Sequence, residues 1–246
     1  MAADLLDQTP ARALAVYAHP DDPEISCGGT LARWAAAGSE VHVLLLTRGD
    51  KGSGDAAVDP DALARRRAVE AEAAAAVLGL AGHEQLGARD GELDNTVEVR
   101  GHVVGVIRRV RPEVLICPDP TAVFFGDTYF NHRDHRVTGW AVLDAVSPAA
   151  GSPLYFPEAG PAHAVGQVLL SGTLEPNVWV DVGGTIDTKV RALRCHESQL
   201  EAAAFGHEGG TADWLSALLR RRAEDGGRVA GVRYAEGFRR LLLAAG

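Results

Sequence analysis

The chain reads ALAVYAHPDDPE from residue 13 to residue 24, an apolar run followed at once by a polar turn that contains two prolines. The run Ala13–Ala18 predicts a short buried strand. His19–Pro23 is expected to form a turn, and Thr30–Ala37 predicts a helix that ends at Gly38. A buried strand that leads through a short turn into a helix is the first unit of an α/β fold.

The same alternation continues along the chain. Strand and helix patterns cover four further segments, the strands at Glu40–Thr47 and Glu113–Cys117 and the helices at Asp61–Leu78 and Thr96–Val110. This order predicts a Rossmann-like three-layer α/β fold, in which helices cover both faces of a mostly parallel sheet. No repeat or linker divides the chain, so we expect a single domain over residues 1–246.

The later part of the chain carries weaker patterns. They predict helices at Arg136–Val146 and Thr185–Ala204 and strands at Val165–Ser171 and Val178–Val182. The tracts Pro118–Arg133 and Gly151–Ala164 are rich in proline and glycine, and we expect both to be loops that lie over a site.

Composition excludes several classes of protein. The 246 residues include 24 basic and 33 acidic side chains, a formal net charge of −9, which argues against a nucleic-acid partner. Three widely separated cysteines form neither a disulfide framework nor a cysteine zinc site, and they suit a reducing compartment. No apolar stretch is long enough to span a membrane, and the first ten residues lack the features of a signal peptide. We therefore expect a cytoplasmic protein without a membrane partner.

Histidine and carboxylate side chains concentrate where two of the predicted strands end. In an open α/β sheet, ligands bind beyond the carboxyl ends of the strands. His19 and Asp22 stand three residues apart on a stiff turn and could converge on a Zn²⁺ ion. One ligand from the pair His132 and His135 would complete a three-ligand site with an open water position. Asp21 would then stand close enough to act as a general base on that water.

Each of these segments also has an ordinary structural explanation. Asp22 and Pro23 fit a helix start, with Asp22 as the N-cap and Pro23 at the first helical position. His132 and His135 could be solvated loop residues. Because both segments are expected at the same rim of one sheet, the metal site is the stronger interpretation.

Several motifs, taken together, resemble one known family. AHPDDPE at residues 18–24 resembles the A-H-P-D-D-x-E signature of the LmbE-like, or PIG-L, family of zinc-dependent N-deacetylases. LTRGDKG at 46–52 resembles its L-T-x-G-E-x-G loop, and RAVE at 67–70, followed by Leu78 and Gly79, its R-x-x-E…L-G helix. HRDHR at 132–136 is similar to H-P-D-H-R, and Lys189 with HESQ at 196–199 is similar to K…H-x-S-Q. The matches follow in order over roughly residues 13–205, which makes chance a poor explanation.

The resemblance implies a Zn²⁺ ion with three protein ligands, His19, Asp22 and His135; Fe²⁺, Co²⁺ and Mn²⁺ are alternatives for such a donor set. It also implies roles for three catalytic residues: Asp21 as the general base, His132 as general acid or oxyanion stabiliser, and Asp134 as the residue that orients an imidazole.

Asp50, Arg67 and Asp90 match positions that contact substrate hydroxyls in sugar-binding relatives. A purely structural role is almost as well supported for each of them. Arg67 could form an ion pair with Glu70 on one helix, and Asp90 could belong to a simple turn. His196 is expected to be helical and to serve as a structural hydrogen-bonding group. The remaining histidines are assigned no role: His42, His83, His102, His163 and His207.

Three departures from the family pattern concern the substrate more than the reaction. Arg133 replaces the usual proline and adds a charge near the metal, and Asp50 is one methylene shorter than the usual glutamate. Phe130 stands where mycothiol-type relatives tend to carry a tyrosine; Tyr129 is adjacent but is expected to face differently.

The sequence therefore predicts a metal-dependent hydrolase that removes an N-acetyl group from a glucosamine-containing small molecule. A mycothiol-conjugate-type amidase and a non-catalytic metal- or sugar-binding protein remain alternatives, and a homo-oligomer is left open. A dinucleotide-dependent oxidoreductase is disfavoured, because HPDDPE occupies the turn where a G-x-G-x-x-G motif should lie.

Overall fold

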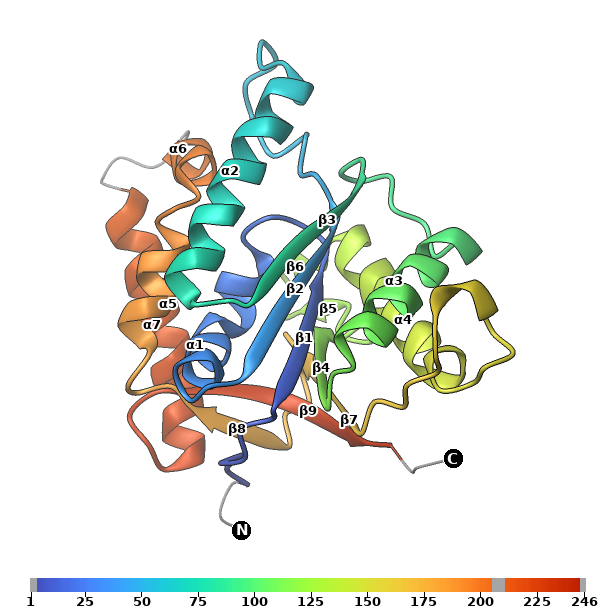
Figure 1. Ribbon diagram of the computed structural model, residues 1–246. Helices are drawn as coiled ribbons and strands as arrows, with labels where there is room; N and C mark the ends of the chain where they lie inside the picture. The colour runs from blue at the N-terminus through green and yellow to red at the C-terminus, as the bar shows by residue number, and fades with distance from the viewer. Residues whose placement is uncertain (1–3, 205–210, 244–246) are drawn as a thin grey trace.

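A seven-stranded sheet forms the centre of the protein in a computed structural model that describes residues 4–204 and 211–243 (Figure 1). The strand order is β3-β2-β1-β4-β7-β9-β8. The first five strands in this order pair in parallel, whereas β9 is antiparallel to both β7 and β8. The strands are β1 Arg12–Tyr17, β2 Glu40–Thr47, β3 Gly82–Ala88, β4 Val114–Pro118, β7 Gln167–Ser171, β8 Val178–Asp181 and β9 Ala235–Leu242. The predicted mostly parallel sheet is confirmed.

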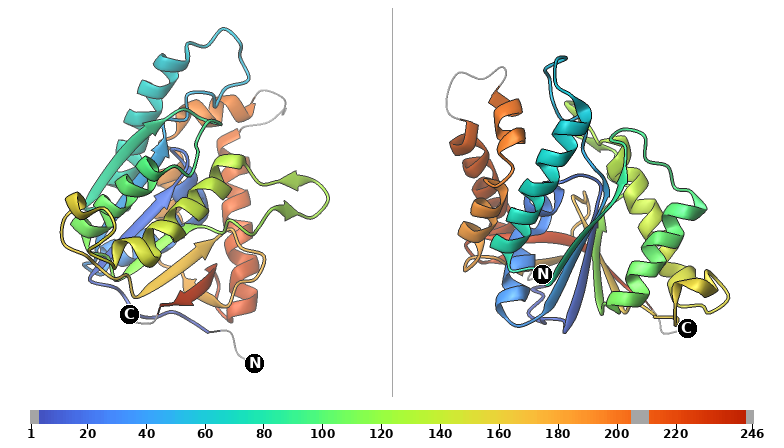
Figure 2. Two further views of the ribbon diagram at one scale, coloured as in Figure 1. Left: turned by 90° about the vertical axis from the view of Figure 1, so that its right-hand side faces the viewer. Right: turned by 45° about the horizontal axis from the view of Figure 1, so that its top comes forward.

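Helices cover both faces of this sheet (Figures 1 and 2). One face carries α1 Asp22–Ala36, α2 Pro60–Leu78, α5 Ile186–Leu193, α6 Glu197–Ala204 and α7 Thr211–Ala230; the other carries α3 Val97–Val110, α4 Arg133–Asp144 and a π-helical turn at Ala145–Ala150. Successive residues of β1 enter opposite cores, Tyr17 on the α1 side and Val16 on the α3 side. Because both faces of β1 are buried, its sequence is a continuous apolar run.

Helix α1 begins at Asp22, eight residues before the predicted start at Thr30. Its backbone leaves helical geometry at Cys27, where φ is −141°, so a second helical segment starts within it. The N–H groups at that second start are satisfied from far along the chain, because the Glu236 carboxylate accepts from Gly29 N at 3.0 Å and Thr30 N at 2.8 Å. The helical segment before Cys27 is therefore short, and Glu236 of β9 caps the segment that follows it.

Other differences lie in polar or late elements. Strand β3 was not predicted because it lies at the edge of the sheet, is only half buried and lacks an apolar run. The helix predicted over Thr185–Ala204 is two helices, α5 and α6, separated around His196. No element was predicted for the segments that form helix α7 and strand β9.

The two proline- and glycine-rich tracts behave differently. The tract 118–133 contains a two-stranded hairpin, β5 Phe124–Phe125 and β6 Tyr129–Phe130, which projects from the body of the molecule (Figure 2). Helix α4 begins at Arg133, earlier than predicted, because His132 caps it through an Nδ1 acceptor 3.2 Å from Asp134 N. The tract 151–164 was expected to lie over a site, but it packs against α3 instead.

The buried side chain of Arg108 holds this second tract in place. Its guanidinium donates six hydrogen bonds of 2.7–3.3 Å to backbone carbonyls, those of Ala149, Ala150, Ser152, Tyr155, Phe156 and Gly160. Backbone N–H groups also pair with four of these carbonyls, those of Ala149, Ala150, Ser152 and Phe156. The buried cation therefore adds a second donor to most of the set and ties the irregular segment to α3.

Among residues 4–204 and 211–243, no helix combines the length and apolar character needed to cross a membrane.

We predict that Arg108→Met lowers the free energy of unfolding by about 1–3 kcal/mol, because it removes six hydrogen bonds from a buried cation to this tract. Arg109→Met is the matched control, since the Arg109 side chain is 61% exposed and forms a surface pair with Glu84. The control should change stability by no more than about 0.5 kcal/mol. Denaturant titration of the two variants measures the difference, and equal effects would contradict the role of Arg108.

Candidate active site

The predicted site residues all gather at the carboxyl edge of the sheet. The loops after β1, β2 and β3 carry His19, Asp21, Asp22, Asp50 and Asp90, the start of α4 carries His132, Asp134 and His135, and Arg67 reaches in from α2. Seven of the nine line one cavity of about 480 Å³: His19, Asp21, Asp22, Arg67, Asp90, His132 and His135. The other two, Asp50 and Asp134, lie directly behind its wall.

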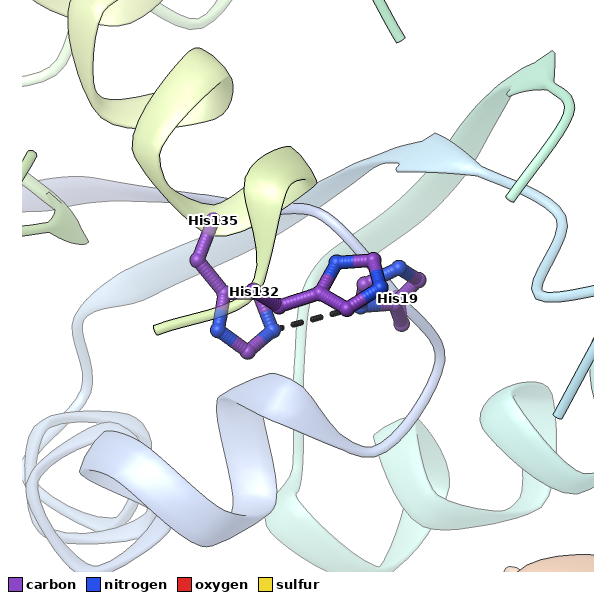
Figure 3. A group of neighbouring side chains, drawn as sticks. All are labelled: His19, His132 and His135. Atoms are coloured by element: carbon purple, nitrogen blue, oxygen red, sulfur yellow. Dashed lines mark hydrogen bonds between the residues drawn. The ribbon is translucent and has the colours of Figure 1, made fainter. Parts of the chain in front are cut away.

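Three side chains converge in this cavity. His19 Nδ1 lies 3.3 Å from His135 Nε2 (Figure 3). His19 Nδ1 also lies 3.3 Å from Asp22 Oδ2, and His135 Nε2 lies 3.1 Å from Asp22 Oδ1. Ligands held at 2.0–2.1 Å around a tetrahedral zinc ion stand about 3.3 Å apart. The two histidine nitrogens stand at that separation from each other, and each faces one oxygen of Asp22, so the three residues fit a metal ion.

The outer nitrogen of His19 faces two further carboxylates. His19 Nε2 lies 3.2 Å from Asp90 Oδ1 and 3.4 Å from Asp134 Oδ2. The fully buried Asp134 is itself fixed, because its Oδ2 accepts from Gly91 N at 2.6 Å. Both carboxylates favour a proton on His19 Nε2, which leaves Nδ1 with a free lone pair toward Asp22 and His135.

Asn131 fixes the ring proton of His135 on its outer nitrogen, as the two carboxylates do for His19. Its Oδ1 lies 3.0 Å from His135 Nδ1, while its amide donates to Ala122 O at 2.8 Å and so fixes which end faces the imidazole. A proton on His135 Nδ1 leaves Nε2 as the inward donor. Asn131 was not assigned a role from the sequence, although its place four residues before His135, one helical turn away, is a usable signal.

The carboxylates around the cavity give it an excess of negative charge that a cation would balance. Burial lowers the pKa of His19, but Asp22, Asp134 and Asp90 outweigh that effect and raise it to about 12. Burial likewise lowers the pKa of His135, and the attraction of Asp22 raises it above its ordinary value. Imidazoles hold protons this tightly only where negative charge is otherwise uncompensated. A divalent cation between these donors would supply the same charge.

Other groupings of donors in the described residues share members with this one. His19, His132 and His135 lie close enough to hold an ion, and so do His19, Asp90, His132 and Asp134. The second grouping uses His19 Nε2, the nitrogen that already faces the carboxylates. The grouping of His19, Asp22 and His135 leaves those contacts intact.

Asp21 occupies the strained position between the strand and the helix. Its φ is 103°, a left-handed conformation that a residue with a side chain adopts rarely. Asp21, rather than Asp22, is the N-cap of α1, and it makes no capping hydrogen bond. The alternative explanation of Asp22 as the N-cap is therefore wrong: its Oδ2 accepts from His19 N at 2.8 Å. Burial raises the pKa of Asp21 to about 6, against the opposing charge of Arg67.

Arg67 holds Asp21 rather than its own helix neighbour. Its guanidinium, on a side chain 3% exposed, lies 3.1 Å from Asp21 Oδ1 and also donates to Gly49 O and Pro20 O. The alternative pair with Glu70 does not form, because Glu70 instead binds Arg66 at 3.0 Å and Ser198 at 2.6 Å.

Asp50 does not reach the cavity. Its Oδ1 accepts from Asp90 N at 2.9 Å, and its Oδ2 pairs with Arg48 at 3.0 Å. The shorter side chain therefore contacts the loop that carries Asp90 instead of the open space.

His132 stands at the open side of the site. Its side chain is 42% exposed, and its Nδ1 accepts from Asp134 N, which places the ring proton on Nε2. Burial and the two neighbouring histidines lower the pKa of His132 below its ordinary value. The ring is therefore a neutral donor whose Nε2 lies 3.9 Å from Asp90 Oδ1.

The other residues that depart from the family motifs point away from the cavity, whereas the neighbouring Tyr129 does not. Tyr129 faces differently from Phe130, as expected, and it lines the cavity. Phe130 points to the outer side of the hairpin, where its ring contacts Phe124 and Arg136. Arg133 turns away toward Leu93 O and Asp94.

Among the remaining histidines, His196 lies between α5 and α6 rather than within a helix. It is fully buried, and its Nε2 is 3.3 Å from Glu24 Oε2. His207 lies outside the described residues.

Comparison with known proteins finds related deacetylases. The family described as "PIG-L: GlcNAc-PI de-N-acetylase" matches residues 14–146. The chain is 36% identical over 232 residues to a diacetylchitobiose deacetylase of Thermococcus kodakarensis, which covers 93% of this chain and 82% of the relative. It is 32% identical over 254 residues to a 1D-myo-inositol 2-acetamido-2-deoxy-alpha-D-glucopyranoside deacetylase of Rhodococcus erythropolis, covering 80% of this chain and 84% of the relative.

A solved structure shares the whole architecture. The N,N'-diacetylchitobiose deacetylase of Pyrococcus horikoshii superposes with a TM-score of 0.83 at 30% identity, covering 95% of this chain and 84% of that one. Fold and site together define an amide hydrolase of the deacetylase class. The chain belongs to the PIG-L family.

We predict that Asn131→Ala weakens metal binding about 10- to 100-fold, because His135 loses the acceptor that orients its ring. Competition against a chelator measures the affinity. Asn95→Ala is the control, because the Asn95 amide donates to Asp144 at an exposed site away from the cavity. Unchanged affinity in a folded Asn131→Ala protein would contradict the assignment.

Proposed function

We propose that this protein is a zinc-dependent hydrolase that removes an N-acetyl group from a glucosamine-containing substrate by attack of a metal-activated water. The observation that carries the proposal is the convergence of His19 Nδ1, Asp22 and His135 Nε2 at mutual distances of 3.1–3.3 Å. Three protein ligands leave the fourth position open, as catalytic rather than structural zinc sites do.

The donor chemistry supports Zn²⁺ as the resident ion, with Fe²⁺, Co²⁺ or Mn²⁺ as ions that the same imidazole and carboxylate ligands accept. A bound Zn²⁺ would polarise the amide carbonyl and lower the pKa of its water to about 7. Asp90 and Asp134 would fix the ring of His19 and Asn131 that of His135, and such outer partners raise the basicity of the inner nitrogen.

Asp21 is proposed as the general base. Its carboxylate follows directly on the ligand loop, lines the cavity and is aimed by the Arg67 guanidinium at 3.1 Å. A base is most effective when its pKa approaches the working pH, and burial moves the pKa of Asp21 in that direction. The backbone strain at this residue places its side chain beside the ligands instead of on the helix cap.

His132 is proposed to act on the intermediate after the water has attacked, as oxyanion stabiliser or as general acid. Its Nε2–H points from the open side of the cavity, where it could stabilise the developing oxyanion or protonate the departing amine. Asp134 fixes this ring as well, because its backbone N–H donates to His132 Nδ1.

The substrate class follows from the relatives. Their names specify a diacetylated chitobiose and a 2-acetamido-glucopyranoside of inositol, both amides of a glucosamine unit. We propose that the present chain also acts on an N-acetylglucosamine derivative, a small molecule. Arg67 and Asp90 on the cavity wall are the proposed hydroxyl contacts, and Asp50 is proposed to act through the Asp90 loop.

We predict that Asp21→Asn lowers kcat for deacetylation by about 10²- to 10⁴-fold, the usual contribution of a general base, while the bound metal is retained. His19→Ala should lose metal and activity together. Metal analysis of the purified proteins and release of free amine from N-acetylglucosamine derivatives, with and without chelator, test both. If Asp21→Asn also loses its metal, Asp21 is a ligand and not the base; if metal-free protein is fully active, the proposed function is wrong.

A further inference from the structure

A cavity of about 580 Å³ lies at the amino ends of the parallel strands, at the opposite edge of the sheet from the proposed metal site. The first residues of β1, β2 and β3 and the C-terminal end of α3 enclose it. It shares no lining residue with the cavity at the metal site. A volume of this order is typical of small-molecule sites, which span about 300–1,000 Å³.

The floor of this cavity is apolar. Leu14 of β1 and Val106 and Val110 of α3 line it, and all three are buried. On the sheet side, the ring of His42 lies across Gly82, its partner in the register, where a Cβ would stand 2.4 Å from His42 Nδ1. Glycine at this position thus leaves room for the imidazole to complete the wall. Such a floor suits the apolar body of a ligand.

The rim of the cavity is rich in arginine. Three arginines and two glutamates line it: Arg12, Arg109, Arg111, Glu40 and Glu84. Glu84 is already paired, because its two carboxylate oxygens lie 2.7 and 2.8 Å from Arg109 Nη2. Two arginines and one glutamate remain, which makes the rim locally positive in a chain whose net charge is −9. A positive rim of this kind attracts anions.

The two remaining arginines are joined by a single contact. Arg12 Nε donates to the backbone carbonyl of Arg111 at 2.9 Å, which fixes the Arg12 side chain and leaves its terminal nitrogens available. Within residues 4–204 and 211–243, neither guanidinium forms an ion pair, although Glu40 stands directly opposite Arg12 in the register of β1 and β2. Two cations held at one rim without a paired carboxylate repel each other, and a bound anion would remove that repulsion.

Arg111 also occupies a strained backbone position. It is the C-cap of α3, with φ at 54°, in the left-handed region. Glycine is the usual residue at such a helix end, because it has no Cβ to clash with the backbone. Strain of this kind persists where the surrounding structure or the function requires the side chain. A long cationic side chain in the place of glycine therefore points to a use for its charge.

An organic anion matches both the floor and the rim. We propose that this cavity binds a small carboxylate or phosphate ester that carries an apolar body. The guanidinium groups of Arg12 and Arg111 would bind the anionic group, since their planar donors fit either oxyanion. The apolar body would lie on Leu14, Val106 and Val110. The site is separate from the metal centre and does not depend on the proposed function.

Calorimetric titration of the metal-loaded protein with four probes tests the ligand class. Phenyl phosphate and benzoate carry an anion on an apolar ring, inorganic phosphate lacks the ring, and benzyl alcohol lacks the anion. The better of the two ring-bearing anions should bind at one site per chain, about tenfold or more tighter than inorganic phosphate or benzyl alcohol. Comparison of phenyl phosphate with benzoate shows which oxyanion is preferred.

Two variants test the assigned residues. Arg111→Gly should weaken binding of the preferred anion about tenfold or more, because it removes a charged donor. It should not lower the midpoint of thermal unfolding, because glycine suits the left-handed backbone there. Arg12→Gln should weaken binding to a similar degree. Arg65→Ala, which removes an exposed arginine of α2 that does not line the cavity, is the matched control and should bind as the wild type does.

A metal site can itself hold an oxyanion, and His19→Ala separates the two places. This variant should bind the preferred anion as tightly as the wild type does. Binding that is lost in His19→Ala and retained in Arg111→Gly overturns the proposal. Equal affinity of the wild type, Arg111→Gly and Arg12→Gln overturns it as well. So does equal affinity for phenyl phosphate, benzoate and inorganic phosphate, or the absence of saturable binding of every probe up to about 10 mM.

Discussion

Uncompensated negative charge around one imidazole is the constraint on which the site depends. Asp22, Asp90 and Asp134 all lie within 3.4 Å of a His19 ring nitrogen, and together they raise its pKa to about 12. Such a cluster is unfavourable in a folded protein unless a cation joins it. The proposed metal ion therefore stabilises the very arrangement that binds it, and the same carboxylates fix the nitrogen that faces it.

The fold supplies this cluster through contacts remote in sequence. Strand β1 delivers His19, and a left-handed Asp21 turns the chain sharply into a short helical segment. That segment can be short because the Glu236 carboxylate, itself paired with Lys189, caps the second segment of the helix. Arg67 joins the turn to α2. These contacts together keep Asp21 in its strained backbone conformation.

The sequence predicted the parts that depend on local pattern. Apolar runs predicted β1, β2 and β4. The rule that ligands bind at strand ends singled out His19 and the pair His132 and His135 before any geometry was known. The sequence could not locate β3, an edge strand without an apolar run, or Asn131, whose role depends on which ring nitrogen it meets.

Anomalous scattering at the zinc absorption edge, measured on crystals of the metal-loaded protein, tests the central claim most directly. The account predicts one ion coordinated by His19 Nδ1, Asp22 and His135 Nε2, with Asp21 beside it but not bound. An ion held by His19 Nε2, Asp90, His132 and Asp134, or a fully active protein without any ion, would contradict it.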